Sequence, residues 1–336
     1  MTIKKAACIG GGVIGAGWIA RLVLNGIDVA IFDPDPEASR KVGEVMENAR
    51  RAYRQMAPQG LPVEGRIVYC QTLAEAVADA DFIQESVPER LDLKHKVLAE
   101  IDAYAPASAL IGSSTSGIKP TDMQQAMTAH PERLVVAHPF NPVYLLPLVE
   151  VVGGEQTSAA FIDKAKAFYA SIGMKPVVVR KEIEAFVGDR LLEAMWREAL
   201  WLIKDGICTV EELDDIMRYS FGLRWAQMGM FQVYRIAGGE AGMRHFMAQF
   251  GPCLSWPWTK LTDVPEFNDE LVDLIAAQSD AQSDAYSVRE LERIRDDNLV
   301  AILDALGKHD DGRGWGAGEL QNEYVRQLSA RAKSEG

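Results

Sequence analysis

The chain has 336 residues, of which 48% are hydrophobic and 25% charged, and its net charge is −13. This length is sufficient for two domains, and the composition is that of an ordinary globular protein. The acidic balance argues against nucleic acid or an anionic membrane surface as the main partner, because both require a basic surface. Four widely spaced cysteines form no CxxC pair, so neither a metal site nor a disulfide framework is predicted. No apolar run is long enough to span a bilayer, and the expected location is the cytoplasm.

The first apolar run, at residues 5–10, breaks into a glycine-rich turn before a helical pattern at 13–26. In this turn, Gly10 permits a tight bend, Gly12 lets a pyrophosphate approach the backbone, and Gly15 allows the helix to pack close to the strand. The free amides at the start of the helix attract phosphate charge. We therefore expect a dinucleotide site that includes Gly10, Gly11, Gly12, Val13, Ile14 and Gly15.

A second strand-like run, at residues 28–33, ends in an acid at the position expected in a dinucleotide-binding fold. The carboxylate of Asp33 can bind the hydroxyls of the adenosine ribose. Asp35 follows closely, and two carboxylates would repel a ribose 2′-phosphate. NAD is therefore the expected cofactor, although the nearby Arg40 leaves NADP as an alternative.

The first half of the chain alternates strand-like and helix-like segments, which is typical of a parallel sheet with helices on both faces. Strands are expected at 5–10, 28–33, 67–70, 81–85, 108–113, 133–137, 147–152 and 175–180. Helices are expected at 13–26, 35–56, 92–104, 120–127 and 157–171. The sequence thus predicts an α/β domain of the Rossmann type, with a doubly wound, mostly parallel sheet.

From about residue 182 the pattern becomes helical only. A strong helical run covers 184–204, and Thr209 and Glu212 have the spacing of a capping box at the start of the next helix. Further helices are expected at 211–218, 240–250, 268–281, 287–306 and 319–332, with a glycine-rich loop at 310–318. These patterns predict an NAD-binding domain at 1–183 and an all-helical domain at 184–336.

Polar residues follow the predicted strands at the edge where ligands of such sheets bind. One strand is followed by the run Gly112–Gly117, another by His138, and Glu150 lies in the apolar run after it. Hydride transfer from an alcohol requires a base for the hydroxyl proton, and a histidine, with an ordinary pKa near ~6.5, suits this task. A carboxylate on the far ring nitrogen would fix the tautomer and stabilise the imidazolium.

These residues resemble the L-3-hydroxyacyl-CoA dehydrogenase family, which has S/N-T-S, H-x-F-N-P and L-V-E motifs in this order. The resemblance covers nearly the whole chain, and it implies an NAD-dependent 3-hydroxy dehydrogenase. It implies that His138 and Glu150 form a catalytic pair, and that Ser116 binds the substrate hydroxyl. It also implies that Asn141 binds at the nicotinamide and substrate, and that Glu89 and Lys94 contact the cofactor.

Several of these positions have simpler interpretations. A histidine before a proline is often only an extended loop residue. Ser114 rather than Ser116 could face the substrate. Glu89 and Lys94 have the spacing of surface charges on a helix, and these alternatives stay open at the level of the sequence.

One departure from the family pattern is Asp189, where the family has an asparagine that helps to hold the substrate oxygen. A carboxylate at neutral pH only accepts hydrogen bonds, and it would repel a phosphate or a carboxylate but attract a cation. Asp189 is therefore expected to bind a cationic substrate group. The alternative is that it pairs with Arg190 or Arg197, or caps the helix start.

The block from Gly222 to Trp258 is similar to branches of the family that act on small hydroxy acids rather than CoA esters. The resemblance implies L-carnitine as the substrate, with L-gulonate or an acyl-CoA as alternatives. Carnitine carries a trimethylammonium group, which aromatic faces and carboxylates hold. The helical half contains six of the seven tryptophans, namely Trp196, Trp201, Trp225, Trp256, Trp258 and Trp315. The resemblance further implies a homodimer formed through the helical domain, while a cofactor-binding crystallin without activity is the non-enzymatic alternative.

Overall fold

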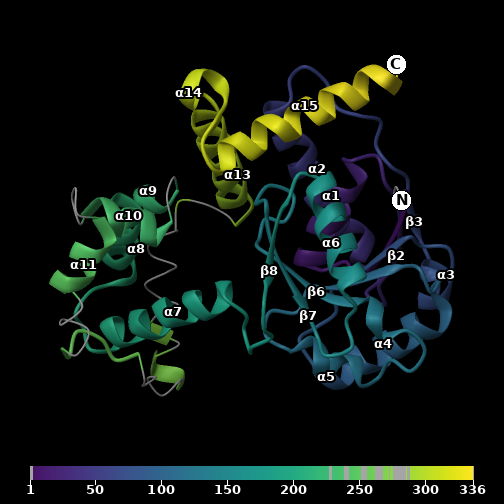
Figure 1. Ribbon diagram of the computed structural model, residues 1–336, viewed down its shortest axis with the longest axis horizontal. Coiled ribbons are helices and arrows are strands. Elements are labelled where there is room, and N and C mark those ends of the chain that lie inside the picture. The colour runs from purple at the N-terminus through teal and green to yellow at the C-terminus, as the bar shows by residue number, and fades with distance from the viewer. Residues whose placement is uncertain are drawn as a thin grey trace. The chain divides into compact units, whose positions relative to one another are not determined.

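The computed structural model describes residues 3–226, 229–237, 242–250, 256–261, 268–271, 273–274, 285 and 288–335. The chain divides into two compact units, of which the first comprises Met1–Asp189 and Asp296–Gly336 and the second Arg190–Arg295. The first is built around a sheet and the second is helical (Figure 1). The sequence placed the domain boundary between residues 183 and 184 and assigned the whole C-terminal part to the helical domain. By its contacts, the segment from Asp296 onward belongs instead with the sheet.

One eight-stranded sheet forms the first unit, in the order β3-β2-β1-β4-β5-β6-β7-β8. Neighbouring strands are parallel except for the antiparallel pair β6 and β7. This arrangement confirms the predicted Rossmann-type, mostly parallel sheet, and every predicted strand is present. The strands are β1 (Lys5–Ile9), β2 (Asp28–Phe32), β3 (Ile67–Tyr69), β4 (Phe82–Glu85), β5 (Leu110–Ser113), β6 (Leu134–Pro139), β7 (Leu148–Gly153) and β8 (Lys175–Val179).

Helices cover both faces of this sheet (Figure 1). One apolar core, which includes Trp18, Val42 and Phe168, lies under α1, α2 and α6. A second core, which includes Leu98 and Met123, lies under α3, α4 and α5 on the other face. The bounds are α1 (Val13–Val23), α2 (Ala38–Met56), α3 (Leu73–Val77), α4 (Leu91–Tyr104), α5 (Pro120–Gln124), the 3₁₀ helix η1 (Pro131–Arg133) and α6 (Ala159–Ser171). The sequence did not predict the short α3 and η1.

The remaining helices begin at residue 188. They are α7 (Gly188–Lys204), α8 (Val210–Tyr219), α9 (Phe221–Trp225), α10 (Met230–Ala237), α11 (Gly242–Phe250), α13 (Val288–Gly307), α14 (His309–Gly312) and α15 (Ala317–Glu335). The predicted capping box is confirmed, because the Thr209 hydroxyl accepts from the amide of Glu212, whose carboxylate accepts from the amide of Thr209. The helix predicted at 268–281 lies largely outside the described residues, and α9 and α10 were not predicted.

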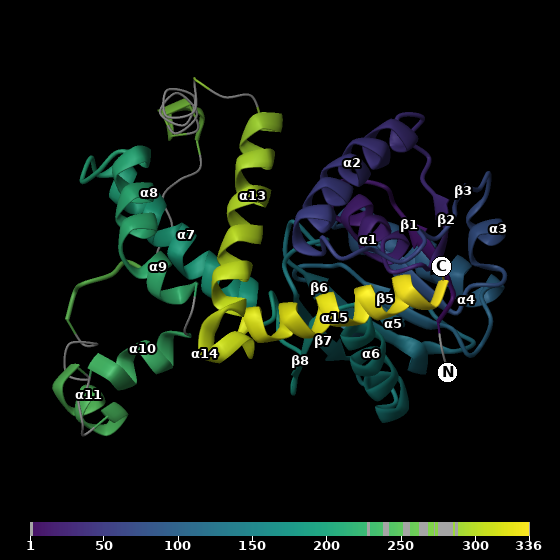
Figure 2. The same ribbon diagram turned by 90° about the horizontal axis from the view of Figure 1, so that it is seen from above.

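The end of the chain returns to the sheet unit. The glycine-rich segment predicted as a loop contains the short α14, in which Asp310 and Asp311 have positive φ angles of 54° and 53°. The following helix, α15, buries Tyr324 and Leu328 in the core under α1 and α2. We refer to residues 296–335 as the C-terminal tail, and Figure 2 shows the ribbon of α15 running along the sheet unit.

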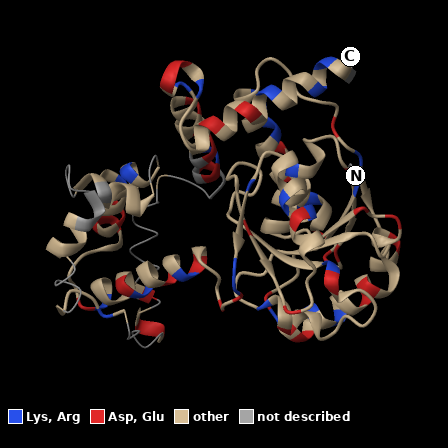
Figure 3. Ribbon diagram, in the orientation of Figure 1, with Lys and Arg blue, Asp and Glu red and all other residues tan. Residues whose placement is uncertain are grey.

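The helices of the tail carry both acidic and basic positions (Figure 3). Examples are the ion pairs between Lys308 and Asp304 and between Arg326 and Glu323, both of which are exposed. Solvent and salt screen such exposed pairs, so the tail depends mainly on its buried contacts. Within the described part of the chain, no helix is both long and apolar enough to cross a membrane.

Candidate active site

The glycine-rich turn between β1 and α1 has the geometry that its sequence predicts. Gly10 has a φ of +99°, and a Cβ there would lie 2.6 Å from the carbonyl oxygen of Ser86. A Cβ on Gly15 would lie 2.0 Å from the carbonyl oxygen of Gly10, so only glycine allows α1 to approach β1 this closely. A Cβ on Gly12 would meet nothing within 4 Å. Gly10 and Gly15 are therefore required by the fold itself, whereas the backbone at Gly12 faces open space.

Asp33 lies at the carboxyl end of β2 and braces this turn. Its Oδ2 accepts from the amide of Gly11 at 2.5 Å, and its Oδ1 accepts from the amide of Asp35 at 2.8 Å. A pocket of about 790 Å³ includes Gly12, Val13 and Asp33 in its lining. A pocket of this size with an open backbone at Gly12 and a carboxylate at its rim fits a dinucleotide.

His138 and Glu150 lie directly opposite each other on the antiparallel pair β6 and β7. Opposed residues of such a pair point to the same face, and Nδ1 of His138 is 2.9 Å from Oε2 of Glu150. Both side chains are buried, at 4% and 3% exposure. The carboxylate selects the tautomer with hydrogen on Nδ1, which leaves the lone pair of Nε2 free to accept a proton.

Glu150 also holds the start of α7. Its Oε1 accepts from the amide of Val187 at 3.1 Å and from the amide of Gly188 at 3.0 Å. Burial by itself would raise the pKa of the Glu150 carboxyl, but hydrogen bonds from His138 and the two amides outweigh burial and lower the pKa below its ordinary value. The carboxylate is thus kept ionised beside the imidazole.

The two residues before Val187 adopt an unusual backbone conformation. Ala185 and Phe186 have φ angles of 59° and 46°, in the left-handed region that costs a residue with a side chain about 1–2 kcal/mol. The Phe186 ring is fully buried, and its centroid lies 5.8 Å from that of His138. Burial of this ring and the amide bonds to Glu150 offset the strain, so the chain enters α7 directly beside the catalytic pair.

Asp189 occupies the first turn of α7 and reaches the same histidine. Its Oδ2 lies 3.6 Å from Nε2 of His138, and its side chain is 26% exposed. The imidazole is therefore flanked by carboxylates on both ring nitrogens. Arg197, one of the partners considered from the sequence, lies 3.7 Å from Glu193.

The serine-rich loop after β5 separates the two candidate hydroxyls. Ser114 Oγ accepts from Nε1 of Trp18 at 3.0 Å and from Nε2 of Gln84 at 2.8 Å, and it shares a hydrogen bond with Ser86. Ser116 is exposed, and its amide donates to Oε1 of Glu89 at 3.1 Å. Because the hydroxyl of Ser114 is bound within the protein, Ser116 is better placed to meet a ligand.

Glu89 and Lys94 belong to one network that supports this loop. Oε1 of Glu89 accepts from the Thr115 hydroxyl and from the amide of Gly117 at 3.0 Å. Burial would raise the pKa of Glu89, but these hydrogen bonds and the Lys94 ammonium lower it overall. The ammonium of Lys94 is 3.5 Å from Oε2 of Glu89 and donates to both oxygens of Glu85, at 2.9 and 3.2 Å.

Sequence reasoning missed Glu85. This carboxylate is completely buried at the end of β4, and it binds the amide of Val87 and the hydroxyl of Ser113 as well as Lys94. Removing one partner of such a buried ion pair costs roughly 3–5 kcal/mol, because the remaining charge is left uncompensated. An acid at a strand end followed by a lysine near the start of the next helix is the sequence signal that could have indicated it.

Asn141 lies in the loop that joins β6 to β7, three positions after His138, and it is exposed. The neighbouring ring of Phe140 has its centroid 5.0 Å from that of His138. A Cβ on Gly188 would lie 2.3 Å from the Phe140 ring, so a glycine is required where α7 begins. Asn141 thus stands at the accessible edge of the same cluster.

Comparison with known proteins gives consistent relatives. The chain is 80% identical over 330 residues to an L-carnitine dehydrogenase of Mesorhizobium japonicum, covering 98% of this chain and 91% of that protein. It is 65% identical over 327 residues to an L-carnitine dehydrogenase/betainyl-CoA thioesterase of Rhizobium meliloti, covering 97% of this chain and 66% of that longer protein. Among solved structures, it is similar to an NAD⁺-dependent 5-formyl-3-hydroxy-2-methylpyridine 4-carboxylic acid 5-dehydrogenase, with a TM-score of 0.75, 27% identity, and coverage of 92% and 100%.

Two domain families divide the chain near the start of α7. Residues 5–183 match the NAD binding domain of 3-hydroxyacyl-CoA dehydrogenase, and residues 186–263 match the C-terminal domain of the same enzymes. The first match covers the glycine turn, the serine loop and both members of the histidine–glutamate pair. The chain therefore belongs to the 3-hydroxyacyl-CoA dehydrogenase family.

Proposed function

We propose that this protein catalyses the NAD-dependent oxidation of L-carnitine to 3-dehydrocarnitine. Carnitine has a hydroxyl on its third carbon, as the substrates of this family do, and it carries a permanent cation. The relatives with high identity over nearly the whole chain are named as L-carnitine dehydrogenases. The observation that carries the substrate assignment is the carboxylate of Asp189, which lies 3.6 Å from the reactive nitrogen of His138.

His138 acts as the general base in this proposal. Its Nε2 accepts the hydroxyl proton of the substrate, while Glu150 holds the ring and stabilises the positive charge that the ring gains. Ser116 donates a hydrogen bond to the substrate oxygen and so orients the hydroxyl toward Nε2. Asn141 binds at the junction of substrate and nicotinamide with its exposed amide.

The glycine turn would hold NAD, which when bound would supply the acceptor for the hydride of the carbinol carbon. The turn from Gly10 to Gly15 would hold the pyrophosphate, with the amides of Val13 and Ile14 in the first turn of α1 as donors, since such amides have no acceptor within a helix. Asp33, which braces Gly11, would bind the adenosine ribose. Glu89 lies toward the nicotinamide end, since it holds the amide of Ser116. Lys94 acts at the same end through Glu89 and Val87.

Asp189 selects a cationic substrate. A trimethylammonium group offers no N–H donor, so it is bound by charge attraction and by aromatic faces. The carboxylate of Asp189 would repel the phosphates of CoA and the carboxylate of a sugar acid.

The direct test is NADH formation by the purified protein with L-carnitine, D-carnitine, L-gulonate and 3-hydroxybutyryl-CoA. We expect turnover of L-carnitine, with the other substrates at least about a hundredfold lower in kcat/KM, because differences in transition-state binding of about 3 kcal/mol suffice for this ratio. Efficient turnover of the CoA ester with no activity on carnitine would refute the substrate assignment while leaving the dehydrogenase chemistry intact.

The helical unit is also proposed to form a homodimer. Helix α8 buries none of its residues, and large apolar side chains of this unit are exposed, among them Ile216, Tyr219, Leu223 and Phe231. An apolar surface of this kind is typical of a protein interface. Light scattering on the wild type and on Phe231→Asp tests this proposal. We expect the wild type to be a dimer and the variant to shift toward the monomer. A monomeric wild type would contradict the proposal.

The cytoplasm is the proposed location. Cys8, Cys70 and Cys208 are free thiols, as is usual in a reducing compartment. Fractionation of cells expressing the protein tests this proposal, and recovery of the enzyme outside the cytoplasmic fraction would contradict it.

A further inference from the structure

The C-terminal tail lies beyond both family matches, which end at residue 263. By its contacts it nevertheless belongs to the same compact unit as the sheet. Tyr324 and Leu328 of α15 are buried, and the Tyr324 hydroxyl is 2.9 Å from that of Tyr53 and 2.6 Å from Nδ2 of Asn25. The tail is therefore an integral layer of the sheet unit, and one of its contacts reaches a loop beside the candidate active site.

One of these contacts reaches the loop between β6 and β7. The hydroxyl of Tyr144 donates to Oδ2 of Asp296 at 2.5 Å, and both residues are buried, with Asp296 completely inaccessible. A buried carboxyl group needs such partners, because its desolvation is otherwise costly. An O–H···O bond of this length to a carboxylate is among the stronger hydrogen bonds in proteins.

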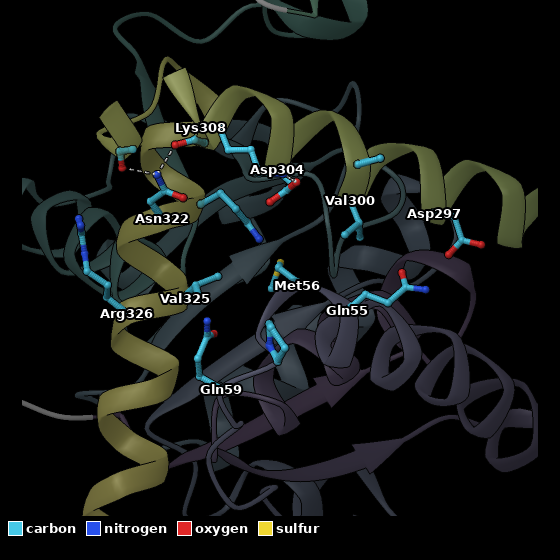
Figure 4. A pocket seen from close by; sticks show the side chains of 15 residues that line it. Gln55, Met56, Gln59, Asp297, Val300, Asp304, Lys308, Asn322, Val325 and Arg326 are labelled. Carbon is cyan, nitrogen blue, oxygen red and sulfur yellow. Dashed lines mark hydrogen bonds and ion pairs between the residues drawn. The ribbon is translucent and has the colours of Figure 1, made fainter. Parts of the chain in front are cut away.

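The hydrogen bond between Tyr144 and Asp296 is not part of a continuously packed interface between the tail and α2. A groove of about 730 Å³ separates part of α13 and α15 from the end of α2, and Met56, Val300 and Val325 line it (Figure 4). The neighbouring Asp297 lies at the edge of this groove and pairs with Arg51 of α2. Two adjacent acids of α13 thus reach different targets, since Asp296 binds the loop and Asp297 binds a helix.

The loop that Asp296 holds is the one that carries Asn141 and follows His138. Arg21 of α1 fixes its other side, because its guanidinium donates to the carbonyl of Val143 at 2.8 Å and to that of Leu146 at 3.3 Å. The Arg21 guanidinium in turn lies 5.9 Å from the ring centroid of Tyr324 in the tail. The loop is therefore held between the cofactor-binding helix α1 and the tail.

We propose that Asp296 is a positioning residue for the reaction, which holds the loop from Phe140 to Pro147 through Tyr144. This inference rests on the proposed roles of His138 and Asn141. The loop joins the two strands that place His138 opposite Glu150, so its displacement moves Asn141 and loosens the pair. A misplacement of about 1 Å can reduce a rate by about a hundredfold.

The test compares Asp296→Ala and Tyr144→Phe with the matched control Asp297→Ala, at a temperature well below the melting point of each protein. The measurements are kcat with L-carnitine, the dissociation constant for NAD, and hydrogen exchange of the amides in residues 138–147. We expect kcat to fall about tenfold or more in the first two variants, with NAD affinity changed less than about twofold. Exchange at 138–147 should increase in these two variants and not in Asp297→Ala.

Two further variants distinguish a positioning role of Asp296 from a role in stability alone. Asp296→Asn keeps an oxygen that can accept from Tyr144, so it should restore most of kcat relative to Asp296→Ala. The double variant of Tyr144→Phe and Asp296→Ala should be little worse than either single change, because both remove the same contact. A lower melting temperature with unchanged kcat and exchange would overturn the proposal, as would equal losses in Asp296→Ala and Asp297→Ala.

Failure of the substrate assignment would be recognised separately. If the wild type oxidises only 3-hydroxybutyryl-CoA or L-gulonate, the same variants are measured with that substrate. If it oxidises none of them, the exchange of residues 138–147 still decides whether Asp296 holds the loop.

Discussion

The carboxylate of Asp189 lies 3.6 Å from Nε2 of His138, and Glu150 binds Nδ1 of the same ring at 2.9 Å. The two acids come from different elements, since Glu150 belongs to β7 and Asp189 to the first turn of α7. Glu150 connects them, because its second oxygen accepts from the amides at the start of α7. A cationic substrate group near Nε2 is therefore attracted by a carboxylate that is only partly exposed.

Replacing His138 tests the proton transfer. We expect His138→Ala to reduce kcat by at least about a hundredfold, because loss of a general base removes a contribution of about 10²–10⁴. NAD affinity should remain nearly unchanged, since the glycine turn is separate from the ring. The control is His130→Ala, which removes a half-exposed histidine paired with Glu132. A substantial residual kcat in His138→Ala would show that another group takes the proton.

Asp189→Asn tests recognition of the cation. The amide is nearly isosteric but uncharged, so we expect KM for L-carnitine to rise about tenfold or more, as for the loss of about 1.4 kcal/mol of binding. Activity on an uncharged 3-hydroxy analogue should be affected less. Glu193→Gln, in the next turn of α7, serves as a matched control because its carboxylate pairs with Arg197. Unchanged carnitine kinetics in Asp189→Asn would contradict the assigned role.

Glu150→Gln should change the pH dependence of stability. The pKa of Glu150 in the folded protein lies below its ordinary value of 4.5, so the folded state binds this proton less readily than the unfolded state. Its stabilisation is complete above the unfolded pKa, and it is lost as the pH falls through the lower folded pKa.

Urea unfolding of the wild type and Glu150→Gln, measured between about pH 3 and pH 7, checks this expectation. The difference in the free energy of unfolding should be about 1–3 kcal/mol above about pH 5 and should shrink toward pH 3. A difference that is constant over this range would show that the carboxylate charge does not stabilise the fold.

Substitutions at two glycines of the turn should affect stability and NAD binding differently. Gly15→Ala places a Cβ 2.0 Å from a carbonyl oxygen, so we expect a large loss of stability, of about 2 kcal/mol or more. Gly12→Ala meets nothing within 4 Å in the protein, so the melting temperature should be retained while the dissociation constant for NAD rises about tenfold or more. Gly43→Ala, also without close neighbours, is the control within α2. Normal NAD binding by Gly12→Ala would contradict the placement of the pyrophosphate.

Local patterns in the sequence predicted much of the fold. The alternation of apolar runs with helical segments gave every strand of the sheet, and the spacing at Thr209 gave the capping box. The tight turn at Gly10 and the close packing at Gly15 followed from the glycine spacing, because backbone conformation and short-range sterics depend on adjacent residues. The five-residue helices α3 and α9 were missed because so few residues give little periodicity, and neither begins with a proline as the equally short α5 does.

The site was predicted in part. The order of the motifs singled out His138 and Glu150, and the antiparallel register of β6 and β7 places them opposite each other. No local pattern distinguished Ser114 from Ser116, because the hydroxyl of Ser114 is bound by Trp18 and Gln84 from distant segments. The buried Glu85 was missed although its partner Lys94 is only nine positions further along the chain, because the complete burial that forces this pair together is a property of the packed sheet.

The sequence by itself determined the α/β class, the glycine turn and the acid after the second strand, because each depends on residues that are close together along the chain. Only the tertiary structure decided that Asp189 lies beside His138, that Glu150 holds the start of α7, and that Asp296 in the tail binds Tyr144. These contacts join segments far apart in sequence, and they exist because burial of the surrounding apolar surface brings the segments together. The partner of each of these charged or hydroxyl groups is set by the fold, and the residues next to it in the sequence do not identify that partner.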